Sequence, residues 1–165
     1  MTQLDYKKAI RNDKYLVVVL QSLSLQMQKT AFSFNSSQAF IDDVISETIY
    51  KVYKNRKKVK NPEYLATWII TILMNECRQE LRRENKYREL YSVDQIPTKH
   101  AHDYSYVHDY LAQLEVEDQE LIRLKVFSDL TFAEISVHFD IPESTVKTRY
   151  YALLKRLKWE MEDLL

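Results

Sequence analysis

Glycine is absent from all 165 residues of this chain, and its absence excludes several kinds of binding site. Nucleotide-binding loops use glycine where the backbone turns tightly or approaches a phosphate, so Walker and Rossmann motifs are excluded. Turns and left-handed backbone positions must instead be occupied by asparagine, aspartate or serine. Four such residues lie between segments of apolar periodicity, as this reasoning predicts: Asn12, Asn35, Asn61 and Asp140.

Cysteine and long apolar runs are also scarce. The single cysteine, Cys77, cannot form an internal disulfide and lacks the paired spacing of structural zinc sites. Near the N-terminus the longest apolar run, Leu16 to Leu20, is far shorter than the ~20 residues that cross a bilayer, and it lacks a signal-peptide cleavage pattern. These features predict a protein of the reducing cytoplasm.

Net charge is absent as well, because 24 Lys and Arg residues balance 24 Asp and Glu residues. This balance argues against a protein that holds nucleic acid by bulk electrostatics. The charges are distributed unevenly, however: the charged residues of segments 51–60 and 147–158 are all basic, and those of segment 94–120 between them are acidic except for Lys99. The two basic segments are candidate nucleic-acid contacts, although solvated helix faces account for such segments equally well.

What the chain does contain is apolar residues at helical spacing over most of its first half. The pattern predicts helices over residues 4–11, over residues 14–32, and after an N-cap segment at residues 35–37. A fourth helix starts after Pro62 and runs to about Tyr87. One face of this helix is apolar and includes the cysteine. Another face carries amide and guanidinium groups: Asn75, Arg78, Gln79 and Arg82. These groups can bind bases and phosphates, but an ordinary solvated helix surface explains them equally well.

The helical pattern fails in the middle of the chain, where Pro97 interrupts a segment rich in tyrosine, histidine and acidic residues. Without an apolar face this segment predicts a flexible acidic linker. Four residues of this segment could be read as metal ligands, but their spacing matches no standard metal site: His100, His102, Asp103 and His108. We therefore expect neither a metal ion nor a cofactor.

The final third contains the most specific pattern. Thr131 and Glu134 have the spacing of a capping box, which opens a short helix that ends at Phe139. A tight turn leads to a second helix over residues 145–159, so the pair forms a helix-turn-helix, a motif that also occurs in proteins that do not bind DNA. The outer face of the second helix carries short hydrogen-bonding groups and cations: Ser144, Thr145, Lys147, Thr148, Tyr151 and Lys155.

All the predicted elements are helices, including one over residues 110–127 that precedes the helix-turn-helix. The predicted fold class is therefore all-α, with two small helical domains at residues 1–88 and 110–165. The flexible linker, residues 89–109, should leave the two domains apart in the free chain.

Two blocks of sequence resemble the extracytoplasmic-function sigma factors of the sigma-70 family. Residues 129–135 (DLTFAEI) and 141–149 (IPESTVKTR) resemble the domain that reads the promoter minus-thirty-five element. Residues 42–48 (DDVISET), 61–69 (NPEYLATWI) and 75–78 (NECR) resemble the other domain. The blocks occur in the right order with a linker between them, and together they cover nearly the whole chain.

The resemblance implies a region 2-like domain at residues 1–88 and a region 4-like domain at residues 110–165. In the first domain it implies contacts to core RNA polymerase at Asp43, Ser46, Glu47 and Lys51. It further implies contacts to minus-ten promoter DNA at Lys57, Lys58, Lys60, Asn61, Trp68, Asn75, Arg78, Gln79 and Arg82. In the second domain it implies contacts to minus-thirty-five DNA at Ser144, Thr145, Lys147, Thr148, Arg149, Tyr151 and Lys155.

Four residues depart from the family pattern. Asn12 and Asp140 replace family glycines, which left-handed geometry at asparagine and aspartate tolerates. Ala152 stands where many members carry a second arginine, which indicates a promoter sequence of its own. Ser46 replaces the usual glutamine and predicts a weaker polymerase contact there.

The functional hypothesis is a sigma factor that directs promoter-specific transcription initiation in an extracytoplasmic stress response. The resemblance further implies an anti-sigma factor, often membrane-anchored, as a partner. A two-domain helix-turn-helix regulator that binds operator DNA directly is the alternative, but its first half would need a ligand pocket. A nucleic-acid enzyme is the third reading, and no paired carboxylates, nucleophile with base or phosphate loop supports it. We therefore expect neither enzymatic activity nor a small-molecule substrate.

Overall fold

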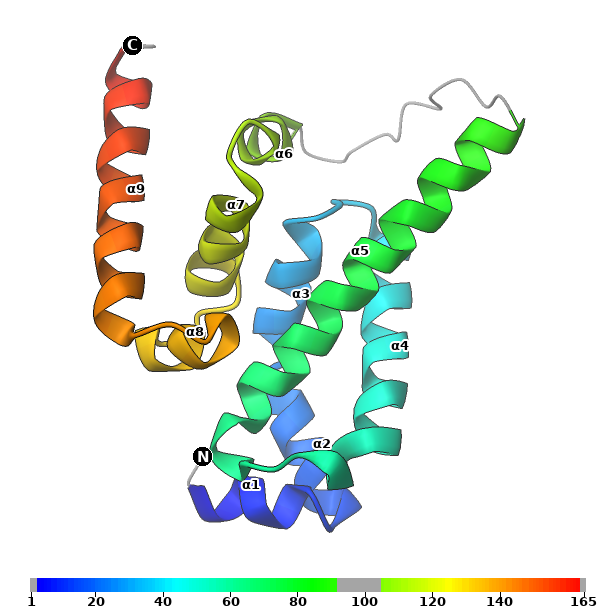
Figure 1. Cartoon of the computed structure of the whole chain (residues 1–165). Helices are drawn as coiled ribbons and strands as arrows, with labels where there is room; N and C mark the ends of the chain where they lie inside the picture. The colour runs from blue at the N-terminus through cyan, green and yellow to red at the C-terminus, as the bar shows by residue number, and fades with distance from the viewer. Residues whose placement is uncertain (1–2, 92–104, 164–165) are drawn as a thin grey trace.

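The computed structural model describes residues 3–91 and 105–163, and every regular element within them is helical (Figure 1). The N-terminal domain contains α1 (Gln3–Ala9), α2 (Asp13–Ser22), α3 (Ser24–Phe32), α4 (Gln38–Asn55), the 3-10 turns η1 (Arg56–Lys58) and η2 (Pro62–Tyr64), and α5 (Leu65–Tyr91). The C-terminal domain contains α6 (Ser105–Ala112), α7 (Val116–Ile122), the π-helical turn η3 (Arg123–Phe127), α8 (Phe132–Phe139) and α9 (Glu143–Asp163). The prediction of an all-α fold with two small helical domains is confirmed.

The predicted linker, residues 89–109, is partly helical, because α5 and α6 extend into its two ends. His108 lies in α6, where its Nε2 is 2.7 Å from the carbonyl oxygen of Phe32. Within the two described ranges no group of three or more His, Cys, Asp and Glu side chains could hold a metal ion. The other three candidate ligands lie outside the described residues: His100, His102 and Asp103.

Asparagine and serine residues begin several helices as N-caps, where a side-chain oxygen accepts a backbone N–H. Asn12 (φ −132°), Ser37 (φ −65°) and Asn61 (φ −119°) all serve in this way. Left-handed backbone at Asn12 was therefore a wrong expectation, whereas Asn61 lies at a turn, as expected. In the described part of the chain the left-handed positions are Asp129 (φ 55°) and Asp140 (φ 54°), so the expectation at Asp140 is confirmed. A short polar side chain replaces glycine there.

The helix predicted over residues 14–32 is divided at Leu23 into α2 and α3. The Ser22 hydroxyl donates a hydrogen bond of 2.7 Å to the carbonyl oxygen of Val19, which also accepts the N–H of Leu23. Such local side-chain bonding competes with the helical ladder, and Leu23 adopts φ −93° and ψ −2°. The periodicity continues through this bend, which is why the sequence pattern did not reveal it.

The helix predicted over residues 110–127 is also divided. A turn follows α6, and the side chain of Gln119 donates a hydrogen bond of 2.9 Å to the carbonyl oxygen of Leu114 in that turn. The chain resumes as α7 and then widens into the π-helical turn η3. The break lets α6 take a different direction from α7, as Figure 1 shows.

Each domain has its own set of fully buried apolar side chains. In the N-terminal domain they come mainly from α5, where Ile69, Leu73 and Met74 have no exposed surface, and α1, α2, α3 and α4 contribute the others. Cys77 lies among them and is fully buried, which confirms its assignment to the apolar face. Burial raises the pKa of its thiol to about 12. The C-terminal core is smaller and consists mainly of Leu121, Leu124, Ile135, Val146 and Leu153.

The two domains contact each other instead of lying apart. The turn η3 packs on α3 and helix α8 packs on α5, while α9 lies on the side away from the N-terminal domain (Figure 1). At the centre of the contact the hydroxyl oxygens of Thr30 and Ser128 are 2.7 Å apart, and both residues are buried. The expectation of separated domains therefore does not describe this conformation.

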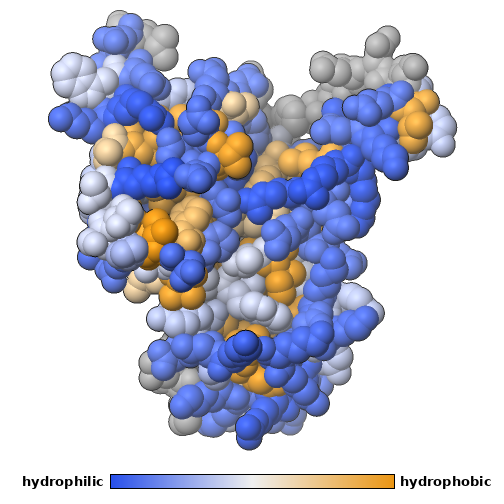
Figure 2. Space-filling view, viewed as in Figure 1, coloured by the Kyte–Doolittle hydropathy of each residue, from blue (hydrophilic) through white to orange (hydrophobic). Residues whose placement is uncertain are grey.

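The surface seen in Figure 2 is mostly hydrophilic, with apolar side chains in scattered patches. Across the described ranges no helix combines the length and the apolar character that a membrane span requires.

Candidate polymerase and nucleic-acid interfaces

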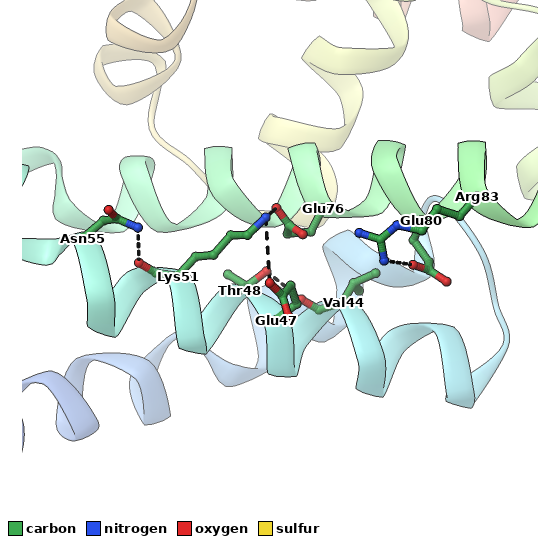
Figure 3. Close-up of polar contacts among 8 residues, drawn as sticks. All are labelled: Val44, Glu47, Thr48, Lys51, Asn55, Glu76, Glu80 and Arg83. Atoms are coloured by element: carbon green, nitrogen blue, oxygen red, sulfur yellow. Dashed lines mark hydrogen bonds and ion pairs between the residues drawn. The ribbon is translucent and has the colours of Figure 1, made fainter.

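An acidic groove lies between α4 and α5 (Figure 3). Its volume is about 430 Å³, and its polar lining includes Asp43, Ser46, Glu47, Glu76, Glu80 and Arg83. Arg83 is engaged by Glu80 at 2.9 Å, so the groove as a whole is negatively charged. Asp43, Ser46 and Glu47 are exposed at its edge. A groove of this charge complements a basic partner surface.

Lys51 lies beside this groove and joins the two helices that form it. Its Nζ is 2.5 Å from Oε1 of Glu76 on α5 and 3.9 Å from Oε1 of Glu47 on its own helix (Figure 3). The Glu76 side chain is only 7% exposed, and a carboxylate in such a site needs a charged partner. Lys51 therefore neutralises part of the negative charge of the groove.

Glu76 and Glu80 belong to the groove although sequence reasoning did not assign them to it. They lie four residues apart on α5, so they share one side of that helix. That spacing was visible in the sequence, but the side that faces α4 could not be identified without the packing of the two helices.

The basic segment after α4 contains residues with two different roles. The Arg56 guanidinium is buried, donates to the carbonyl oxygens of Ile10 (3.2 Å) and Tyr53 (2.8 Å), and pairs with Asp13. It therefore fastens the loop to α1 and α2. The remaining predicted residues of this loop are exposed to solvent: Lys57, Lys58, Lys60 and Asn61.

A cavity of about 890 Å³ separates this loop from α1. Five of its lining residues are cations, namely Lys7, Lys8, Arg11, Lys57 and Lys60. Cations brought together in this way attract phosphate groups. The three cations before residue 12 were not predicted as contacts, because nothing in the sequence places α1 against the loop.

A second cavity, of about 470 Å³, lies between the loop, the start of α5 and the C-terminal domain. Trp68, Thr67 and Thr71 contribute to it from α5, and Val137 and His138 contribute from α8. The predicted minus-ten residue Trp68 is half-buried here. The structure thus brings part of the predicted minus-ten face into contact with the helix-turn-helix.

Farther along α5 the predicted polar face continues at Asn75, Gln79 and Arg82, which are all exposed. Arg78 shares their side of the helix but is half-buried. Its Nη2 lies 3.3 Å from Oε2 of Glu120 on α7. Three of these four residues are therefore exposed to a ligand in this conformation, and Arg78 is held by the C-terminal domain.

The helix-turn-helix has the predicted local structure. The Thr131 hydroxyl accepts the N–H of Glu134 at 3.2 Å, and the Glu134 carboxylate accepts the N–H of Thr131 at 2.7 Å, which confirms the capping box. At the other end of α8, left-handed Asp140 ends the helix, and the Ser136 hydroxyl donates to the carbonyl oxygen of Ile141 at 2.6 Å. These bonds fix the turn from which α9 starts.

Helix α9 presents most of its predicted reading positions to solvent. Its buried side chains, Val146 and Leu153, hold it on the domain. Lys147 pairs with Glu143 one turn earlier at 2.8 Å, and that hydrogen bond raises the pKa of Lys147. The exposed positions are Ser144, Thr145, Lys147, Thr148, Tyr151 and Lys155, with Ala152 beside them.

Arg149 differs from the other predicted minus-thirty-five residues. Its guanidinium pairs with Glu117, and its Nε lies 3.5 Å from Oδ1 of Asp118 on α7. The hydrogen bond to Glu117 raises the pKa of Arg149. Asp118 also accepts Arg156 at 2.8 Å, so the two arginines hold α9 against α7.

Fold and surfaces together define a two-domain helical protein with a helix-turn-helix and a second basic and polar face. Comparison with protein families agrees with this division. Residues 20–87 match the family model of sigma-70 region 2, and residues 104–157 match that of sigma-70 region 4.

Similar proteins extend the match over nearly the whole chain. RNA polymerase sigma factor SigV of Bacillus subtilis is 29% identical over 164 residues, which cover 96% of this chain and 99% of SigV. ECF RNA polymerase sigma factor SigL of Mycobacterium tuberculosis is 26% identical over 145 residues, 81% of each chain. The chain belongs to the sigma-70 family, in its extracytoplasmic-function group.

Two solved structures share the fold at 18% sequence identity. The structure of CnrH in complex with the cytosolic domain of CnrY has a TM-score of 0.67 and covers 94% of this chain and 95% of that one. Sigma factor RpoE in complex with the anti-sigma factor NepR from Bartonella quintana has a TM-score of 0.62, with 91% and 96% covered. Members of this family act in transcription initiation by RNA polymerase and are regulatory, non-catalytic proteins.

Proposed function

We propose that this sigma factor binds core RNA polymerase through the groove between α4 and α5 and reads a two-part promoter with its two domains. The observation that carries this proposal is the capped helix-turn-helix, from which α9 exposes six polar and cationic side chains at its reading positions. Helix α9 meets the requirements of a recognition helix in a major groove, since one face is anchored and the other is free.

The polymerase contact in this proposal is electrostatic. Asp43, Ser46 and Glu47 offer exposed acceptors at the edge of the groove, and Glu76 and Glu80 add negative charge from α5. Lys51 holds the Glu76 carboxylate in place. A basic or amide-bearing helix of the polymerase would find hydrogen-bond acceptors along one line, and rim charges would mainly raise the association rate.

The minus-ten contact in this proposal begins at the basic loop. Lys57, Lys58 and Lys60 would neutralise phosphates of the opened strand, and the Trp68 indole would offer a surface for base stacking. Asn61 caps the turn that begins this face, so its position depends on its bond to the N–H of Glu63. The strand would continue along α5 past Asn75, Arg78, Gln79 and Arg82.

The minus-thirty-five contact in this proposal uses the outer face of α9. Lys147 and Tyr151 lie one turn apart and can reach base edges together, while Ser144, Thr145, Thr148 and Lys155 offer hydrogen bonds to bases and phosphates. We assign Arg149 a different role from the one first expected, because Glu117 and Asp118 already occupy its donors. It positions α9 on the domain.

The setting of this activity is also part of the proposal. We place the protein in the cytoplasm, where core polymerase is, and in an extracytoplasmic stress response. An anti-sigma factor, membrane-anchored as in many members of the group, would be its inhibitor. The RpoE structure with a similar fold is a complex with an anti-sigma factor, which supports this part of the proposal.

Transcription with purified components tests the function. The chain is added to core polymerase with fragmented DNA of its source organism as the template, and the transcripts are sequenced. We expect discrete start sites that share two upstream sequence elements and that are absent with either protein alone. Tight, sequence-specific DNA binding by the free chain at physiological salt, with no start sites gained by polymerase, would instead establish a direct operator-binding regulator.

A further inference from the structure

A cluster of three aromatic rings joins α8 to the exposed face of α9. The ring centroids of Phe132 and Tyr151 are 5.9 Å apart, those of Phe132 and Tyr150 are 5.5 Å apart, and those of the two tyrosines are 5.5 Å apart. The ring planes are inclined to one another by 53° to 68°, as in the tilted and edge-to-face pairs that aromatic rings favour over a face-to-face sandwich. Each ring therefore restricts the orientation of the other two.

Phe132 is held in place by the start of its own helix. It is the first residue of α8 and directly follows Thr131, whose reciprocal hydrogen bonds with Glu134 form the capping box. Its ring is half-buried, whereas Tyr151 is 59% exposed. The phenyl ring thus lies between the body of the domain and a tyrosine on the outer face of α9.

A cation ties the Phe132 ring to the turn η3. The Nζ of Lys125 lies over the ring, 4.6 Å from its centroid, and donates a hydrogen bond of 3.0 Å to the carbonyl oxygen of Leu130. Ammonium groups at such a distance are attracted to the face of an aromatic ring. Leu130 is itself buried, and its N–H donates to the carbonyl oxygen of Leu124 at 3.0 Å. The ring is therefore anchored to the domain independently of α9.

The two principal reading positions of the proposed function both approach this ring. Besides the contact with Tyr151, the Nζ of Lys147 lies 5.9 Å from the Phe132 ring centroid, and the same Nζ is 2.8 Å from the Glu143 carboxylate. Lys147 and Tyr151 are four residues apart on α9 and share one face of it. One anchored phenyl ring therefore contacts two side chains that we assign to base recognition.

The direction of an exposed side chain on a helix is otherwise poorly fixed. Aromatic and long side chains of helices adopt χ1 values near 180° and near −60°, and the two values point the side chain to different places. In the major groove the pattern of donors, acceptors and methyl groups changes with each base pair, so the direction of the side chain decides which base it meets. A side chain oriented before binding also loses less conformational entropy in the complex.

We propose that Phe132 is a positioning residue for minus-thirty-five recognition, whose anchored ring orients the Tyr151 ring and the Lys147 ammonium group toward base edges. This inference rests on the proposed function, because α9 is taken to read that element. A phenyl ring has no hydrogen-bonding group with which to bind a phosphate or a base edge. Phe132 therefore acts through its two neighbours on α9, and its loss should relax base preference at the base pairs that they meet.

A base-preference profile tests the proposal with the full chain. Holoenzyme assembled with core RNA polymerase transcribes a template library whose minus-thirty-five element is randomised, and the transcripts are sequenced. The Tyr151→Ala and Lys147→Ala variants identify the base pairs that depend on each residue. Phe132→Leu, which keeps an apolar side chain but removes the ring, should lower discrimination at those base pairs about fivefold. Phe132→Tyr, which keeps the ring, should stay within about twofold of the wild type.

Phe139→Leu is the matched control. It removes a phenyl ring from the other end of α8, where the ring contacts His138. We expect this variant to keep the base-preference profile of the wild type, whatever it does to the total amount of transcript. An unchanged profile with Phe132→Leu, or the same relaxation with Phe139→Leu, would overturn the positioning role.

A double variant separates positioning from direct contact with DNA. If Phe132 acts through Tyr151, Phe132→Leu should cause little further loss of discrimination, less than about twofold, at the Tyr151-dependent base pairs once Tyr151→Ala is present. A full additional fivefold loss in the double variant would show that the phenyl ring contacts DNA itself, and it would overturn positioning through Tyr151.

The orientation of Tyr151 can also be measured without DNA or polymerase. In full-length chain with labelled tyrosine, the couplings to its β-protons should report one dominant χ1 value in the wild type and an average over two values in Phe132→Leu. Averaged couplings in the wild type would contradict orientation by Phe132. If Tyr151→Ala and Lys147→Ala leave the profile unchanged while the couplings behave as expected, it is the assignment of α9 to base recognition that fails.

Discussion

The two domains use their polar residues in different ways. In the N-terminal domain two cations of the candidate interfaces are tied to other helices, Lys51 to Glu76 and Arg78 to Glu120. On α9 the reading positions are exposed, and Lys147 forms its ion pair with Glu143 on the same helix. These two N-terminal cations are therefore coupled to folding and to the contact between the domains, whereas the exposed positions of α9 can change its specificity without changing the fold.

The largest expected difference concerns the lysines of the two domains. Lys51→Met leaves the buried Glu76 carboxylate without a partner, and we expect a loss of about 2 kcal/mol in the free energy of unfolding. Lys147→Met, the matched change at an exposed pair, should alter it by less than about 0.5 kcal/mol. Urea denaturation measures both. Equal effects would remove the distinction between a coupled and a free surface.

Substitutions on α9 should impair promoter recognition without lowering stability, the opposite of what is expected for Lys51. Lys147→Ala and Tyr151→Ala together should weaken use of the minus-thirty-five element by about 1 to 3 kcal/mol if the contacts are to bases, with stability unchanged. Transcription from promoters that differ only in this element gives the measurement. A uniform loss on all upstream sequences would identify phosphate contacts instead.

A smaller effect is expected at the acidic groove. Asp43→Ala with Glu47→Ala should weaken binding to core polymerase by about 1 kcal/mol, since both carboxylates lie at an exposed rim. Asp42→Ala is the matched control, because Asp42 is an exposed neighbour on α4 that does not line the groove. Competition for labelled polymerase compares the three proteins. Equal affinity of the double variant and the control would remove the groove from the polymerase contact.

The smallest expected effect sharpens the division within α9. Arg149→Ala should cost about 0.5 kcal/mol of stability, because its ion pairs to α7 are partly exposed. Promoter preference should stay as in the wild type. A changed base preference at one position of the minus-thirty-five element would return Arg149 to the reading set.

The sequence patterns predicted local structure better than they predicted contacts between distant residues. The capping box at Thr131 and the left-handed Asp140 depend on neighbours within a few residues, and both were predicted correctly. Asn12 was misplaced because an extended N-cap and a left-handed turn favour the same residue types. The bend at Leu23 could not be predicted from the sequence pattern, because apolar periodicity continues through it.

Tertiary contacts set the limits of prediction at the candidate sites. Nothing near Arg78 or Arg149 in the sequence indicates that Glu120 and Glu117 would reach them, since the partners are more than 30 residues away. The same limitation hid the contact of η3 with α3. Residues of the sites could therefore be predicted by type and helix face, but their availability required the packing.

The central claim is that each of the two promoter elements is read by a different domain. Scrambling one promoter element tests this claim most directly. Two double variants are compared with the wild type: an α9 variant with Lys147→Ala and Tyr151→Ala, and a loop variant with Lys58→Ala and Lys60→Ala. Transcription is measured on an intact promoter and on a promoter whose minus-thirty-five element is scrambled. We predict that scrambling abolishes the difference between the α9 variant and the wild type but leaves the defect of the loop variant in place. A defect of the α9 variant that persists undiminished on the scrambled promoter would contradict the assignment.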